Sequence, residues 1–275
     1  MKFDMGRAWD EATRLLRSNT GLVALIAGVF ILVPNCLFMM QFLDLATMFE
    51  NPSMARNPEL VSNAFAQFFA DNWWALILTV LGQAIGMLAI IILLSDRGRP
   101  TTGAAIGDAA KLAIPSIAAS LLMYLAFTIL ILLPVMIGGA LQSVAVAIIL
   151  VLPAIVAVCY IFAKFSLVQA VFGIERTFNP VAALARSWRL TKGSSRLLFI
   201  FFFLLWFAFA IVSQVVSLFV SLILALVSAE AAMFGNALVS SAIGAGYAAL
   251  TAAVMVSAYR QLTGEPKAEL AQTFD

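Results

Sequence analysis

The sequence offers few side chains that could carry out catalysis. It contains no histidine, the residue most often used as a general base and as a metal ligand. It contains no His-Glu-x-x-His, Gly-x-Ser-x-Gly or Walker pattern, and no apolar stretch carries a pair of carboxylates. The two cysteines, Cys36 and Cys159, both lie in apolar stretches, where we expect buried thiols and no disulfide. These absences predict a protein that is not an enzyme and has no cofactor or metal site. A hydrolase acting on lipids is the weakest of the alternatives.

The most distinctive polar pattern lies between Phe165 and Gly193. This segment holds six of the sixteen Lys and Arg residues when Lys164 and Arg196 at its margins are counted. Asn179 and Pro180 are suited to begin a helix, and Gly193 is suited to end it. Basic side chains on a helix at a membrane surface attract anionic lipid. The candidate interaction residues are Glu175, Pro180, Arg186, Ser187, Trp188, Arg189, Lys192 and Gly193.

The second half of this segment resembles the glycerophosphoryl diester phosphodiesterase membrane-domain family and related uncharacterised inner-membrane proteins with several spans. Those proteins have a cytoplasmic helix that starts at a proline, followed by Ser and then by Leu-Thr-Lys-Gly. The matching positions are Pro180, Ala183, Leu184, Ser187, Leu190, Thr191, Lys192 and Gly193. The resemblance implies the membrane module alone, because the soluble phosphodiesterase domain of some relatives depends on histidines. It implies a fold and a location and leaves the activity open.

The composition indicates that most of the chain lies in a lipid bilayer. Of 275 residues, 63% are hydrophobic and 11% are charged, against about 25% charged in soluble domains. Stretches of about 20 apolar residues can cross a membrane as helices. We therefore predict an all-α membrane protein with one domain, residues 1–275, and a short cytoplasmic tail, 261–275. The Gly138-Gly139 pair separates the third span from the fourth. The predicted spans are 21–43, 73–94, 114–137, 141–163, 197–227 and 232–259.

The basic residues indicate an orientation. With six spans, fifteen of the sixteen Lys and Arg residues lie on the side of the N-terminus, and only Arg56 lies on the other. Segments rich in Lys and Arg stay in the cytoplasm. We therefore predict a multi-pass protein of the cytoplasmic (inner) membrane with both termini in the cytoplasm. The acidic residues predicted on the far side are Asp44, Glu50, Glu59, Asp71 and Glu230.

The cytoplasmic segments predict three repeated units, each an amphipathic interfacial helix followed by a hairpin of two spans. The amphipathic segments start at Asp4, Thr102 and Asn179. The peptide GVFILVP at 28–34 resembles FTILILLP at 127–134, while the fifth span has no such proline. Helices of this kind lie in the headgroup layer, where they bind lipid or merely anchor the hairpins.

The interiors of the spans contain no ionisable side chain. Gly82 and Gly86 form a Gly-x-x-x-Gly pair, which predicts close helix packing. The leading hypothesis is a non-enzymatic membrane protein whose basic helices bind membrane lipids, anionic headgroups in particular, or a membrane-protein partner, and no nucleic acid. The alternative is a transporter or channel for an apolar or amphipathic solute, with Gln83 and Gln214 lining its path.

Overall fold

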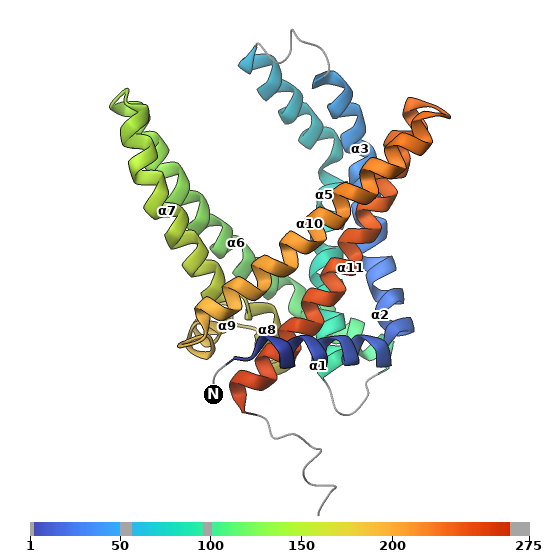
Figure 1. Ribbon diagram of the computed structural model, residues 1–275, viewed down its shortest axis with the longest axis vertical. Coiled ribbons are helices and arrows are strands. Elements are labelled where there is room, and N and C mark those ends of the chain that lie inside the picture. The colour runs from blue at the N-terminus through green and yellow to red at the C-terminus, as the bar shows by residue number, and fades with distance from the viewer. Residues whose placement is uncertain (1–2, 50–56, 96–100, 265–275) are drawn as a thin grey trace, which may run out of the picture.

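The computed structural model describes residues 3–49, 57–95 and 101–264, which form a bundle of helices without any strand (Figure 1). The elements are α1 (Met5–Ser18), α2 (Thr20–Ala27), the π-helix η1 (Gly28–Leu32), α3 (Val33–Phe49), α5 (Pro58–Ser95), α6 (Thr102–Ala140), α7 (Val144–Phe165), α8 (Val168–Glu175), α9 (Pro180–Leu190), α10 (Ser195–Ala225) and α11 (Ala229–Thr263).

Six of the helical stretches are long and apolar enough to cross a membrane, which confirms the predicted all-α, multi-pass fold. Several of them continue beyond the predicted spans and are longer than a helix needs to cross the hydrocarbon layer. The six stretches are Thr20–Phe42, Glu59–Ser95, Thr102–Ala140, Val144–Glu175, Ser195–Ala225 and Glu230–Thr263.

Every Lys and Arg that the structure describes lies at one end of the bundle. We call this the basic end; it consists of α1, the start of α6, the end of α7, α8, α9, the start of α10 and the end of α11. Glu59 and Glu230 begin helices at the opposite end. The remaining basic residues, Lys2, Arg56, Arg97, Arg99 and Lys267, lie outside the described residues. The predicted cytoplasmic location of the basic end stays a prediction.

Two of the three predicted amphipathic segments are separate helices. The Asp4 carboxylate accepts a hydrogen bond from the Arg7 N–H (3.0 Å) and caps α1, which lies across the basic end (Figure 1). The Asn179 side chain accepts from two N–H groups of the first turn of α9, with Pro180 at the first helical position. The structure differs from the prediction at Thr102, where the segment is the first part of α6 and continues into the span. The helix runs on from the amphipathic segment into the span through Pro115.

The two peptides that suggested the repeat differ in conformation. Residues 28–32 form the π-helix η1, whereas residues 127–133 belong to the continuous α-helix α6. Gly82 and Gly86 of α5 lie directly against η1, where a Cβ on either glycine would collide with Phe30 or Ile31. The predicted close packing at this glycine pair is therefore confirmed, and its partner is the π-helix.

An additional short helix forms the centre of the basic end. The apolar sequence that follows the fourth span turns at Ser166 and Leu167 and continues as α8. Val168, Val171 and Phe172 of α8 are buried, and the helix contacts α5, α6, α9 and α11. The α6–α7 hairpin joins the bundle near α8 and diverges from the other membrane helices toward its tip (Figure 1).

Candidate functional site

The Ser and Thr of the distinctive motif attach α9 to the end of α7. Ser187 and Thr191 are four residues apart, so their side chains share one face of the helical segment. The Ser187 hydroxyl donates to the Lys164 carbonyl at 2.8 Å, and the Thr191 hydroxyl donates to the same oxygen at 3.2 Å. Both side chains are fully buried. They satisfy a carbonyl at the C-terminus of α7 that has no partner within its own helix. The role of Ser187 is therefore to position Lys164.

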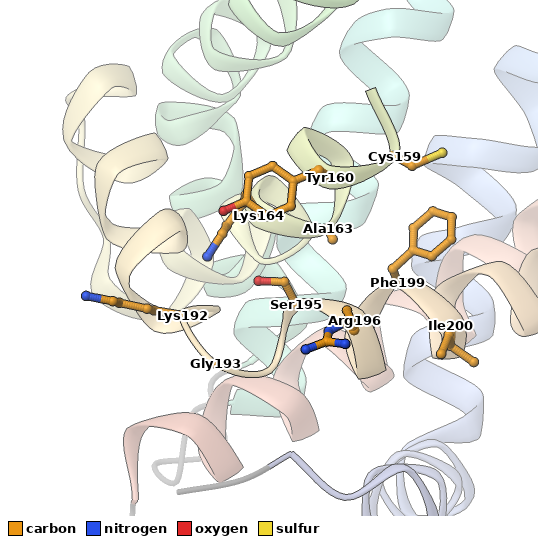
Figure 2. A pocket seen from close by; sticks show the side chains of 10 residues that line it. All are labelled: Cys159, Tyr160, Ala163, Lys164, Lys192, Gly193, Ser195, Arg196, Phe199 and Ile200. Atoms are coloured by element: carbon orange, nitrogen blue, oxygen red, sulfur yellow. The ribbon is translucent and has the colours of Figure 1, made fainter. Parts of the chain in front are cut away.

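A pocket of about 470 Å³ lies between the end of α7 and the start of α10, beside the turn that joins α9 to α10 (Figure 2). Its lining combines three cations with apolar side chains, and none of its ten residues is acidic. The lining residues are Cys159, Tyr160, Ala163, Lys164, Lys192, Gly193, Ser195, Arg196, Phe199 and Ile200.

Lys164 is the most deeply buried charge of this pocket, with 4% of the residue exposed. Its ammonium lies 5.5 Å from the ring centroid of Tyr160 and 5.3 Å from that of Trp188. The two rings are nearly perpendicular, with centroids 5.8 Å apart. Among the described residues, no carboxylate forms an ion pair with Lys164.

Two aromatic rings offset part or all of the cost of this burial. A desolvated cation–π contact stabilises by about 2 kcal/mol. The burial of an unpaired ammonium costs several kcal/mol. Because no carboxylate of the described residues pairs with Lys164, its charge remains available to an anion from outside the protein.

The other two cations of the pocket come from the α9–α10 junction. Lys192 lies in the turn and Arg196 in the first turn of α10, and neither pairs with a carboxylate in the described part of the chain. Gly193 has φ +89°, a conformation that favours glycine and that redirects the chain into α10. The N-cap Ser194 makes no side-chain capping bond, and Ser195 and Arg196 of the first turn of α10 line the pocket.

Two of the candidate residues form a different cluster, in which charge is paired within the protein. The Arg186 Nε donates to the Glu175 Oε1 at 2.7 Å, and the Tyr259 hydroxyl donates to the same oxygen at 2.6 Å. The bond to Glu175 raises the pKa of the Arg186 guanidinium above its ordinary value. We call Glu175, Arg186 and Tyr259 the clamp, because they connect α8, α9 and α11.

A second paired cluster holds α1 in place. The Arg260 guanidinium contacts the Glu11 carboxylate at 3.1 Å and donates to the Leu94 and Ser95 carbonyls, at 3.0 and 3.2 Å. The Ser257 hydroxyl donates to the same carboxylate at 3.1 Å. These contacts join α1, α5 and α11 and give Arg260 a structural role.

The structure divides seven of the eight predicted candidates into three groups. Trp188, Lys192 and Gly193 lie at the pocket; Glu175 and Arg186 form part of the clamp; Pro180 and Ser187 shape and attach α9. Arg189 is exposed and has no ion-pair partner among the described residues.

The candidate set contains only Lys192 and Gly193 of the ten residues that line the pocket, and it omits Lys164, Tyr160 and Arg196 among others. The sequence contains one signal for them, because Tyr160 and Lys164 are four residues apart on one helix face. The ring of Trp188, however, reaches Lys164 only when α9 folds back on α7.

Two further expectations concern polar side chains within the spans and metal ligands. Gln83 and Gln214 are both exposed. In the described part of the chain, no group of three or more His, Cys, Asp and Glu side chains could hold a metal ion.

Comparisons with protein-family models, with curated proteins and with solved structures find no match to this chain. The resemblance to the phosphodiesterase membrane-domain family stays a prediction that depends on the short motif of α9.

Proposed function

We propose that this chain is a non-enzymatic protein of the cytoplasmic membrane that binds anionic lipid at its basic end, with that end in the cytoplasm. The observation that carries the proposal is the pocket between α7 and α10, which Lys164, Lys192 and Arg196 all line and whose ten lining residues include no carboxylate. Cations left unpaired beside apolar membrane helices attract the negative headgroups of the same leaflet.

The charge distribution supports the same proposal. All described Lys and Arg residues lie at one end, as the positive-inside rule requires of a cytoplasmic face. Each cation at that end attracts an anionic leaflet by about 1 kcal/mol. The helices α1 and α9 place several of these cations beyond the apolar spans.

The proposal is tested with the full chain reconstituted in bilayers of phosphatidylcholine. Electron paramagnetic resonance of spin-labelled lipids measures the fraction of lipid whose motion the protein restricts. We expect spin-labelled phosphatidylglycerol to be restricted more than spin-labelled phosphatidylcholine, and we expect added salt to reduce the difference. Equal restriction of both lipids would exclude the proposal.

A matched pair of variants assigns the effect to the pocket. In the first, Lys164→Gln, Lys192→Gln and Arg196→Gln remove three unpaired cations. In the control, Arg7→Gln, Lys111→Gln and Arg176→Gln remove three cations of the same end that pair with Asp4 or Asp108. The net charge changes equally. We expect only the first variant to lose the preference for phosphatidylglycerol.

A further inference from the structure

The lining of the pocket also bears on which anionic lipid it would bind. The inference drawn from it rests on the proposed function. We propose that the pocket binds one phospholipid whose headgroup ends in a phosphomonoester, and that it prefers this lipid to a phosphodiester lipid with one charge. The phosphate is placed among Lys164, Lys192 and Arg196, and the start of an acyl chain lies on the apolar side of the pocket.

The lining requires an amphiphilic ligand. In Figure 2, Lys164, Ser195 and Arg196 lie on one part of the pocket wall, and Cys159, Phe199 and Ile200 lie on the other. A soluble anion would leave the apolar part wet, whereas an apolar solute would leave the cations without a partner. A volume of about 470 Å³ suits a phosphate, its glycerol and the first carbons of a chain. The rest of the chain would follow the exposed surface of α7 and α10 in the membrane.

The number of cations favours a headgroup with two charges. A phosphomonoester carries a charge of about −1.5 to −2 near pH 7 and three acceptor oxygens. A phosphodiester carries one charge and exposes two such oxygens. Because no acidic residue lines the pocket, the second charge of the monoester meets no repulsion there. The Arg196 guanidinium can bind two phosphate oxygens at once, which a lysine cannot do.

Lys164 makes the pocket selective, because its position is fixed before the ligand arrives. Its carbonyl is held by Ser187 and Thr191, and its ammonium lies against Tyr160 and Trp188. Lys192 is exposed and can turn toward many anions. The buried ammonium can meet only a group small enough to enter the pocket, and a terminal phosphate is such a group.

Native mass spectrometry of the full chain in detergent tests this proposal. The purified protein is mixed with equal amounts of dioleoyl phosphatidic acid, phosphatidylglycerol and phosphatidylcholine, and the complexes with one lipid are counted. We expect phosphatidic acid to be bound about tenfold more than phosphatidylglycerol. We expect Lys164→Gln and, separately, Arg196→Gln to abolish this ratio, while Arg7→Gln leaves it unchanged. The exposed Arg196 gives a readout even if Lys164→Gln reduces folding.

The outcomes separate this proposal from the previous one. If phosphatidic acid and phosphatidylglycerol bind equally and both exceed phosphatidylcholine, the selectivity is wrong and the anionic-lipid function stands. If all three bind equally, both proposals fail. If soluble glycerol 3-phosphate displaces phosphatidic acid at an equal concentration, the pocket recognises phosphate alone and the lipid assignment is wrong.

Discussion

The clamp and the pocket use the same kinds of side chain for opposite purposes. In the clamp, Glu175 accepts hydrogen bonds from Arg186 and Tyr259, and the charges are neutralised within the protein. In the pocket, Lys164 and Arg196 have no carboxylate, although Lys164 is the more buried of the two. Both clusters take their cations from the segment between Lys164 and Arg196. The comparison teaches that paired cations here join helices, whereas unpaired cations remain available to a ligand.

The strongest way to break this comparison is to give the pocket its own carboxylate. Ser195→Glu places an acid in the pocket lining and in the first turn of α10, where a negative charge also favours the helix. We expect the preference for anionic lipid to disappear, because the cations then pair within the protein. Native mass spectrometry measures this loss. Thr102→Glu adds the same charge to the first turn of α6 and is expected to leave binding unchanged; an effect of equal size there would contradict the comparison.

The second prediction removes the support of Lys164 and keeps its charge. Ser187→Ala combined with Thr191→Ala leaves the Lys164 carbonyl without its two side-chain donors. A buried group without its partner costs about 1–3 kcal/mol, so we expect a lower midpoint of thermal unfolding in detergent. We also expect weaker binding of anionic lipid. Ser18→Ala, which removes an exposed hydroxyl of α1, serves as the control. Normal lipid binding by the destabilised variant would show that α9 does not position Lys164.

The third prediction disables the clamp alone. Glu175→Gln keeps the shape of the side chain and removes the charge that Arg186 and Tyr259 share. Because this ion pair is partly exposed, we expect a loss of about 1 kcal/mol in the free energy of unfolding. Lipid binding should stay the same. A double-mutant cycle with Arg186→Gln measures the coupling between the two side chains. A strong effect of Glu175→Gln on lipid binding would show that the clamp and the pocket act as one site.

The smallest expected effect concerns the turn before α10. Gly193 has φ +89°, and a Cβ at this position would meet no neighbouring atom. Gly193→Ala therefore adds only backbone strain, of about 1 kcal/mol. We expect a small drop in the unfolding midpoint and a slight loss of lipid binding, since the turn carries Lys192. Gly103→Ala, at a helical glycine with open space, is the control.

The sequence predicts the features that depend on composition and on local capping. The six apolar helices, the separation of charge and the caps at Asp4 and Asn179 follow from residue types and short spacings. The close packing of Gly82 and Gly86 follows as well, although its π-helical partner does not. The separate helix α8 is not predictable in this way, because its apolar residues continue the composition of the fourth span.

The candidate site is harder to predict from the sequence than the fold is. Arg186 and Lys192 are six residues apart and appear as one basic group, yet among the residues that the structure describes only Arg186 pairs with a carboxylate. Lys164 lies at a predicted span end, where the long side chain is expected to extend to water. Its ammonium lies against the ring of Trp188, which is 24 positions later in the chain, on a helix that the hydrogen bonds of Ser187 and Thr191 fasten to the end of α7.

The divergent α6–α7 hairpin has a mechanical consequence for this region. At about 1.5 Å per residue, the 22 residues of α7 form a rod of about 33 Å. The rod diverges from the bundle at its tip and is fastened at its base, where Lys164 lies (Figure 1). Sideways pressure from the bilayer therefore acts as torque about that base, and a small rotation there moves the tip through a much larger arc.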